Sequence, residues 1–264
     1  MKGAVKMVTL SLLNRKGGVG KTTASVNLAA IFAKSNNKKV LLIDSDPQAN
    51  STTYLGKFLT KDDISIYDVL CGDTDIADAV IDTDIENLRL LPSNQNLSKA
   101  DLEMASMPAA RKFILQNKLN AMTEEYDYVI IDCPPDDNNL TINALTASDY
   151  AVIPCEATEY GVDSILAMSG FISEIQRCAN QNLKVAGMLF TRKENTMVQN
   201  IYLDQFKQNL TAYHFFGTEI RKTTVVEKSL SNHTPLIVYA PNENVTKDYI
   251  AVAEELRGII ERGA

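Results

Sequence analysis

Hydrophobic and polar positions along the chain follow two alternating patterns. Short runs that are apolar at successive positions predict buried β-strands, and they lie at residues 5–13, 40–43, 88–91, 128–131, 150–154 and 185–190. Stretches with apolar residues at helical spacing lie between and after them, at residues 22–33, 108–122, 162–179, 197–210 and 245–262. Because alternating strands and helices favour right-handed crossovers, the pattern predicts an α/β fold: a doubly wound, mostly parallel twisted sheet with helices on both faces.

One long segment does not follow this alternation. Residues 57–85 show no clear period, and we interpret them as an irregular surface segment. The chain has 264 residues, of which 45% are hydrophobic, so it can bury a substantial core. We therefore expect a single domain spanning residues 1–264.

The charge of the chain is acidic overall but unevenly distributed. A net charge of −7 argues against a protein that coats nucleic acid with its whole surface. Residues 62–86 contain nine acidic side chains and no lysine or arginine, whereas residues 185–232 contain six basic side chains against four acidic ones. An acidic chain with this distribution can still present one basic face.

The cysteines and the apolar runs indicate a cytoplasmic protein. The four cysteines stand apart without a C-x-x-C pair, which predicts neither a disulfide framework nor a zinc site. No signal-peptide pattern precedes the first apolar run, and no run approaches the roughly 20 residues of a membrane span. We also expect no separate DNA-binding domain at the N-terminus, because the first predicted strand begins almost at once.

The stretch NRKGGVGKTT, residues 14–23, follows the first predicted strand and begins the first predicted helix. In this strand–loop–helix context its three glycines allow successive backbone N–H groups to face one anion, at a helix N-terminus that favours negative charge. Lys21 would then neutralise phosphate oxygens, and the hydroxyl of Thr22 would ligate Mg²⁺. The usual motif is G-x-x-x-x-G-K-[ST], but Arg15 replaces its first glycine and is followed by an additional cation, Lys16.

Two further stretches place carboxylates at the ends of predicted strands, where chemistry gathers in a doubly wound sheet. In VLLIDSDPQ, Asp44 ends a strand and could orient an attacking water molecule. Asp46 could do the same, or could be only a helix N-cap. In YDYVIIDCPP, Asp132 follows four apolar positions, as expected of a carboxylate associated with Mg²⁺.

These three stretches resemble the ParA/MinD family of deviant Walker ATPases, and most closely its ParA/Soj branch. The loop of that family is K-G-G-x-x-G-K-[ST] or close to it, and residues 16–22 read KGGVGKT. Further similarity lies in DSDPQANST (44–52), LTINALTASDYAVIP (140–154) and TPLIVYAPNENVTKDYIAVAEEL (234–256). The resemblance covers nearly the whole chain, and its motifs are weaker beyond Phe190.

The resemblance implies an ATPase that uses ATP and Mg²⁺ and acts as a homodimer. In this family the additional lysine, here Lys16, reaches across a two-fold interface to the phosphates held by the partner subunit. The implied catalytic residues are Lys16, Lys21 and Asp44. The implied metal-associated residues are Thr22, Asp44 and Asp132, and the implied nucleotide-binding residues are Lys16, Gly17, Gly18, Val19, Gly20, Lys21, Thr22 and Thr23.

The resemblance also implies a function in plasmid or chromosome partitioning. The ATP-bound dimer would bind DNA without sequence preference, and a ParB-like, DNA-bound partner protein would stimulate hydrolysis and release it. The expected DNA contacts are Arg192, Lys193, Arg221 and Lys222, although Arg221 stands where the family commonly has proline. Such a protein would lie in the cytoplasm and associate with the nucleoid in its ATP state.

Three alternatives share the same loop. A membrane-positioning ATPase like MinD would need a basic amphipathic C-terminal helix, and the sequence AVAEELRGIIERGA does not supply one, so no membrane partner is expected. An ATPase that positions protein cargo remains open. An iron protein resembling the nitrogenase reductase would need cysteines presented to a shared cluster, whereas Cys133 and Cys155 are predicted to be small core residues.

Overall fold

The computed structural model describes residues 7–123, 125–158 and 161–263, and within these residues seven strands form one sheet in the order β3-β4-β2-β5-β1-β6-β7. All neighbouring strands are parallel except the pair β3 and β4. The strands are β1 (Val8–Leu12), β2 (Val40–Asp44), β3 (Ile81–Asp82), β4 (Leu88–Leu91), β5 (Tyr128–Asp132), β6 (Tyr150–Cys155) and β7 (Lys184–Phe190).

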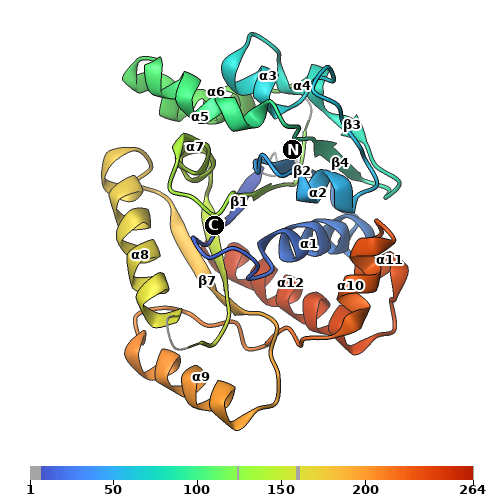
Figure 1. Ribbon diagram of the computed structural model, residues 1–264, viewed down its shortest axis with the longest axis vertical. Coiled ribbons are helices and arrows are strands. Elements are labelled where there is room, and N and C mark those ends of the chain that lie inside the picture. The colour runs from blue at the N-terminus through green and yellow to red at the C-terminus, as the bar shows by residue number, and fades with distance from the viewer. Residues whose placement is uncertain (1–6, 124, 159–160, 264) are drawn as a thin grey trace.

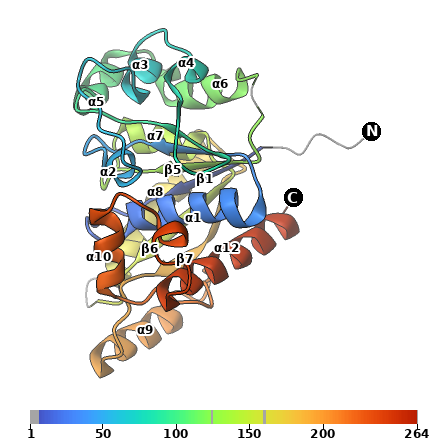
Figure 2. The ribbon, with the colours of Figure 1, turned by 90° about the vertical axis from the view of Figure 1, so that its right-hand side faces the viewer.

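Helices cover both faces of this sheet (Figures 1 and 2). One face carries α1 (Lys21–Asn36), α10 (Thr224–Ser231), α11 (Leu236–Tyr239) and α12 (Asn244–Gly263). The other carries α3 (Ile66–Cys71), α4 (Ile76–Ala79), α5 (Leu97–Ser106), α6 (Ile114–Asn120), α7 (Asn139–Thr146), α8 (Gly161–Cys178) and α9 (Met197–Asn209). A short α2 (Asn50–Tyr54) follows β2, and a 3-10 turn (Ala109–Phe113) precedes α6.

The strands alternate between two apolar cores, one on each face of the sheet. In β5, Val129 and Ile131 belong to the core under α3 to α8, whereas Tyr128 and Ile130 belong to the core under α1 and α12. Because successive side chains of a strand point to opposite faces, a strand between two helix layers buries both sets of side chains and is apolar at most positions. This is why the sequence shows continuous apolar runs, and the predicted doubly wound α/β fold is confirmed.

Element boundaries differ from the predicted ones mainly at the ends. The first strand begins at Val8, and the part of its predicted range at residues 5–6 lies outside the described residues. The helix predicted over residues 108–122 is divided into a 3-10 turn and the shorter α6. The other predicted helices agree with α1, α8, α9 and α12 to within a few residues.

The prediction that residues 57–85 form an irregular surface segment is wrong for its second half, where short helices and a strand form, whereas residues 57–64 are irregular and largely exposed. The segment contains α3, α4 and the edge strand β3. Five of its apolar side chains are buried in the core on the α5 and α6 side, namely Ile66, Val69, Leu70, Ile76 and Ala79. Helices of four to six residues are too short to show a helical period, so the sequence pattern could not reveal them.

The parallel register brings three loops together at the carboxyl ends of the central strands. Leu12 at the end of β1 and Asp44 at the end of β2 both pair with Asp132 at the end of β5. The glycine-rich loop, the loop after Asp44 and the loop after Asp132 therefore leave the sheet side by side. In open α/β sheets this edge is where ligands bind.

We expect Ile66→Ala to lower the free energy of unfolding by about 3 kcal/mol, because the Ile66 side chain is fully buried and its removal leaves a cavity. The matched control is Ile64→Ala, since Ile64 is 52% exposed and its removal should cost less than about 0.5 kcal/mol. Urea unfolding of both variants measures the difference. Equal effects would show that the segment does not fold onto the core.

Candidate nucleotide site

The glycine-rich loop needs glycine at two of its positions. Gly18 has φ +77° and Gly20 has φ +81°, a region of backbone conformation that other residues rarely adopt. Gly20 is also the N-cap of α1, so its conformation aims the first amides of that helix at the loop. The resulting turn can present backbone N–H groups to a phosphate, as predicted.

Residues before and beyond the loop hold it in place. The side-chain amide of Asn14 donates to the carbonyl oxygen of Pro154 at 2.7 Å, and its oxygen accepts from the backbone N–H of Lys16 at 2.9 Å. The hydroxyl of Thr191 donates to the carbonyl oxygen of Val19 at 2.7 Å. The side chain of Val19 is buried, so only the backbone of Val19 can contribute to the site. The loop is thus fastened to β6 and β7.

Lys21 is a buried cation at the bottom of the loop. The residue is only 7% exposed, and its Nζ lies 3.0 Å from the carbonyl oxygen of Asn14 and 3.5 Å from that of Lys16. Burial lowers the pKa of this amine, and the nearby charge of Asp132 opposes the change. A triphosphate would supply the negative charge that an ammonium group needs in a buried position, which supports the predicted role of Lys21.

Asp44 and Asp132 lie side by side on adjacent strands, and neither has exposed surface. Burial, reinforced by the charge of Asp132, raises the pKa of Asp44 to about 7. Burial raises the pKa of Asp132 to about 6, against hydrogen bonds from the hydroxyls of Thr22 and Ser51 that lower it. Asp132 and the hydroxyl of Thr22 are hard oxygen ligands behind the phosphate loop and could hold Mg²⁺ directly or through water.

The structure does not place Asp44 where it could orient a water molecule at the mouth of the site. One of its oxygens accepts from the backbone N–H and the hydroxyl of Thr52, both at 2.7 Å, and the other accepts from the N–H of Asp46 at 3.2 Å. Asp46 lines the pocket instead. Asp46 is also not a helix N-cap, because its carboxylate caps the turn at Gln48 and α2 begins only at Asn50.

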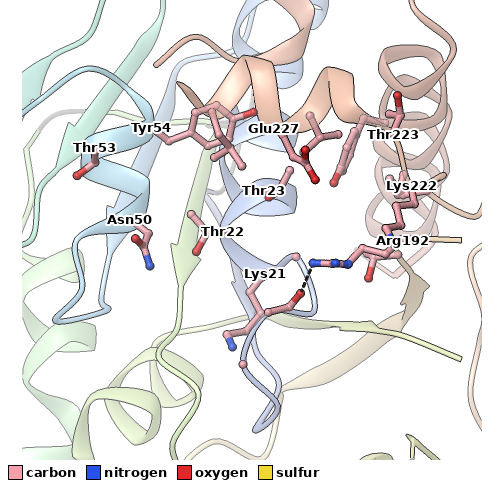
Figure 3. Close-up of a pocket in the computed structure, with 18 of the residues that line it drawn as sticks. Lys21, Thr22, Thr23, Asn50, Thr53, Tyr54, Arg192, Lys222, Thr223 and Glu227 are labelled. Carbon is pink, nitrogen blue, oxygen red and sulfur yellow. Dashed lines mark hydrogen bonds between the residues drawn. The ribbon is translucent and has the colours of Figure 1, made fainter. Parts of the chain in front are cut away.

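The pocket above the loop has a volume of about 710 Å³. Its floor is formed by the loop and the start of α1, and its walls by α2, by α10 and by the residues that follow β7 (Figure 3). Among the predicted nucleotide-binding residues, the pocket is lined by Gly17, Gly18, Gly20, Lys21, Thr22 and Thr23. This volume is in the range of known small-molecule sites.

Two cations of the loop lie at its outer face. The side chain of Lys16 is 46% exposed, and its Nζ lies 3.2 Å from the carboxylate of Glu156, which also accepts from Arg192 at 2.9 Å. Arg15 is ion-paired with Asp137. Lys16 does not line the pocket that holds Lys21, so the two lysines of the motif lie in different environments.

The four predicted DNA contacts come together, but each has a partner within the chain. Lys193 and Arg221 form a β-bridge, and Lys222 is ion-paired with Glu194. Arg221 donates two hydrogen bonds, at 2.6 and 2.8 Å, to the buried carboxylate of Asp248 on α12. Arg192 contacts the carbonyl oxygen of Gly18 at 3.3 Å and lines the pocket, as Figure 3 shows. Arg221 is thus part of the fold, which argues against it as a freely available DNA contact.

Sequence reasoning missed several residues that hold the site. No role was predicted for Asn14, Ser51, Thr52 or Glu156, and Thr191 was not among the predicted site residues. Asn14, Glu156 and Thr191 are polar residues just after strands, which is a signal that could have marked them as candidates, whereas Ser51 and Thr52 lie in α2. Apart from the contact between Thr52 and Asp44, eight residues apart, the contacts join segments far apart in the chain, so their partners could not be inferred.

Cys133 and Cys155 are buried, and burial raises the pKa of both thiols. This confirms them as core residues. Buried thiols are not presented to an iron–sulfur cluster shared between subunits, as the iron-protein alternative requires. Within the described residues, no helix is long and apolar enough to cross a bilayer.

A pH-dependent stability difference should follow from the buried Asp44 carboxyl. Its pKa is raised to about 7 in the folded state, so its protonated form stabilises the fold, and this contribution is lost as the pH rises through about 7. Asp44→Asn is neutral at every pH. Without nucleotide or Mg²⁺, the free energy of unfolding of Asp44→Asn minus that of the wild type should therefore be about 1 kcal/mol larger at pH 8.5 than at pH 6. The corresponding difference in melting temperature should rise by about 3 °C.

The control for this experiment is Asp84→Asn, because the Asp84 side chain is 94% exposed. Its melting temperature should follow that of the wild type over the same pH range. A difference between Asp44→Asn and the wild type that stays constant with pH would contradict the raised pKa of Asp44.

Comparisons with known proteins agree with this geometry. Residues 7–185 match the model of a family described as AAA domain. The sporulation initiation inhibitor protein Soj of Bacillus subtilis is 35% identical over 94% of this chain and 97% of its own length. The chromosome partitioning protein ParA of Caulobacter vibrioides is 31% identical over 94% of this chain and 92% of its own length.

Solved structures give the same result. Cobyrinic acid a,c-diamide synthase from Mycobacterium smegmatis, with bound ADP and magnesium, has a TM-score of 0.85 and 27% identity over 98% of this chain and 97% of that chain. A plasmid partition protein from Borrelia burgdorferi, bound to AMPPNP, has a TM-score of 0.79 and 27% identity over 98% and 100% of the two chains. The chain therefore belongs to the ParA/Soj family of partitioning ATPases.

Proposed function

We propose that this protein is an ATP-dependent dimerising ATPase that partitions a plasmid or a chromosome. The observation that carries the proposal is the pair of lysines in one loop, with Lys21 buried below the pocket and Lys16 exposed on its outer face. A single bound triphosphate requires only one of them in its own subunit. The second is left available for the nucleotide of another copy.

Within one subunit, the loop and the start of α1 would hold the triphosphate by their backbone N–H groups, and Lys21 would neutralise its oxygens. Thr22 and Asp132 would hold Mg²⁺, which neutralises charge on the phosphates during transfer. Of the aspartates at and after the ends of β2 and β5, Asp46 is the one that lines the pocket, and we assign to it the orientation of the attacking water. Asp44 would stay behind Asp132 and hold α2 through Thr52.

In the dimer, Lys16 would exchange Glu156 for the phosphates held by the partner. A cation from the second chain offsets the charge that triphosphate and Mg²⁺ leave in a desolvated interface, where Coulomb interactions are strong. Dimerisation would therefore depend on ATP. Membership of the partitioning family supports this arrangement.

The dimer would bind DNA without sequence preference through the basic residues near the pocket, chiefly Lys193 and Lys222. Two copies double a weakly basic face, so affinity for a polyanion rises with the ATP state. A ParB-like, DNA-bound partner would stimulate hydrolysis, and the protein would associate with the nucleoid in the cytoplasm. Protein cargo is the second candidate function, because the site itself would serve either cargo.

Membrane positioning is not favoured by the position of α12. Its apolar side is buried against the sheet and α1, with Val252, Leu256 and Ile260 in the core. The side chains of Glu254 and Glu261 remain exposed beside Arg257. A helix that has already buried its apolar face and exposes acidic residues does not fit an anionic bilayer.

Lys16→Ala should bind ATP normally but weaken the ATP-dependent dimer by about a hundredfold or more, since each interface loses a cation facing a buried anion. Sedimentation with a slowly hydrolysed ATP analogue measures this, beside nucleotide binding to the monomer. The matched control is Arg15→Ala, which removes the neighbouring exposed cation and should leave the dimer intact. A Lys16→Ala dimer as tight as the wild type would refute the cross-subunit role.

Lys222→Gln should weaken duplex binding in ATP for every DNA sequence alike. Because both subunits lose one phosphate contact, the slope of log affinity against log salt should fall by about two. Lys61→Gln is the control, with the same loss of charge on an exposed residue next to the acidic stretch of residues 62–86. Fluorescence anisotropy at several salt concentrations gives both slopes, and equal slopes for the two variants would place the DNA surface elsewhere.

A further inference from the structure

The segment that carries Asp46 has little burial of its own to hold it. Gln48 and Asn50 are exposed, and Pro47 and Ala49 are only partly buried. Ala49 has φ +53°, a left-handed backbone conformation that an alanine rarely adopts. A partly exposed segment in an unfavourable conformation depends on contacts with the surrounding structure in addition to its own hydrogen bonds.

Ser93 fixes both ends. This residue is fully buried in the loop after β4, the strand that pairs with β2. Its hydroxyl donates to the carbonyl oxygen of Asp46 at 2.8 Å, and its backbone N–H donates to the hydroxyl of Thr52 at 3.0 Å. The hydroxyl of Thr52 in turn donates to Asp44 at 2.7 Å. One residue thus spans the segment from residue 46 to residue 52.

The residues on either side of Ser93 reach in the opposite direction. The carbonyl oxygen of Pro92 accepts from the N–H of Ile66 at 2.9 Å, at the start of α3. The side-chain amide of Asn94 donates to the carbonyl oxygens of Thr60 and Asp63 at 3.2 and 2.9 Å. Residues 92–94 therefore connect the segment of Asp46 to residues 60–66, which lead into α3.

We propose that Ser93 is a positioning residue for ATP hydrolysis: its hydroxyl sets the place of Asp46 and touches neither nucleotide nor water itself. This inference rests on the role proposed above for Asp46. These hydrogen bonds do not connect Ser93 to the phosphate loop. Loss of its hydroxyl should therefore slow hydrolysis without weakening nucleotide binding or dimerisation. A misplacement of a reacting group by about 1 Å can cost up to about a hundredfold in rate.

The test is Ser93→Ala in the full chain, with hydrolysis measured at saturating Mg²⁺-ATP and duplex DNA. The backbone N–H of residue 93 and the N–H of Ala49, which also donates to the Asp46 carbonyl at 2.9 Å, remain in place. We therefore expect a partial effect: kcat about tenfold lower, KM unchanged, and an ATP-dependent dimer that forms as in the wild type but persists longer. Ser98→Ala is the matched control, because its hydroxyl bonds only to the nearby carbonyl of Gln95.

Asp46→Asn is measured beside it as the reference. If Asp46→Asn is inactive and Ser93→Ala hydrolyses ATP like the wild type, the inference about Ser93 is overturned and the proposed function stands. A loss of ATP affinity, dimer and melting temperature together with kcat would make Ser93 a structural residue and also overturn it. Normal hydrolysis by Asp46→Asn would overturn the assignment of Asp46 on which both depend.

Discussion

The site depends on one unfavourable arrangement: two carboxylates, Asp44 and Asp132, are buried next to each other at the ends of adjacent parallel strands. Their charges repel, and the interior cannot solvate them, so both pKa values lie well above the ordinary range for aspartate. Lys21 is the nearby cation, and burial lowers its own pKa. Such a group of buried charges is completed by a ligand that carries both signs, and a triphosphate with Mg²⁺ is such a ligand. Structure and chemistry therefore point to the same occupant.

The same two carboxylates bring residues from several separate segments of the chain into the site. Hydroxyl groups of α2 and α1 satisfy the carboxylate oxygens, with Ser51 and Ser25 donating to Asp132 and Thr52 to Asp44. Ser51 and Thr52 belong to α2, which follows the segment of Asp46, so hydrogen bonds link both buried carboxylates to the helix at the end of that segment. On the other side, Lys16 stands outside this network beside Glu156. The buried carboxylates are placed for ATP hydrolysis, and the exposed Lys16 is placed for contact with a second subunit.

The sequence predicted the sheet, the long helices and the phosphate loop because each has a strong local signature. Strands buried on both faces are apolar at most positions, and the loop needs glycine where φ is positive. It did not predict the short helices of residues 57–85, whose order comes from packing. It also chose Asp44 over Asp46, because both end the same apolar run, and only the contact with Thr52 shows which one is enclosed. The partners of Arg221 and Ser93 were equally invisible, since both contacts join distant segments.

The central claim is that two copies close around ATP through the exposed face that bears Lys16. The most direct measurement is the molar mass of the full chain in solution by light scattering, with a slowly hydrolysed ATP analogue and with ADP. The account predicts twice the subunit mass of 29.1 kDa in the analogue and the subunit mass itself in ADP. The subunit mass in both nucleotides, at saturation, would contradict it.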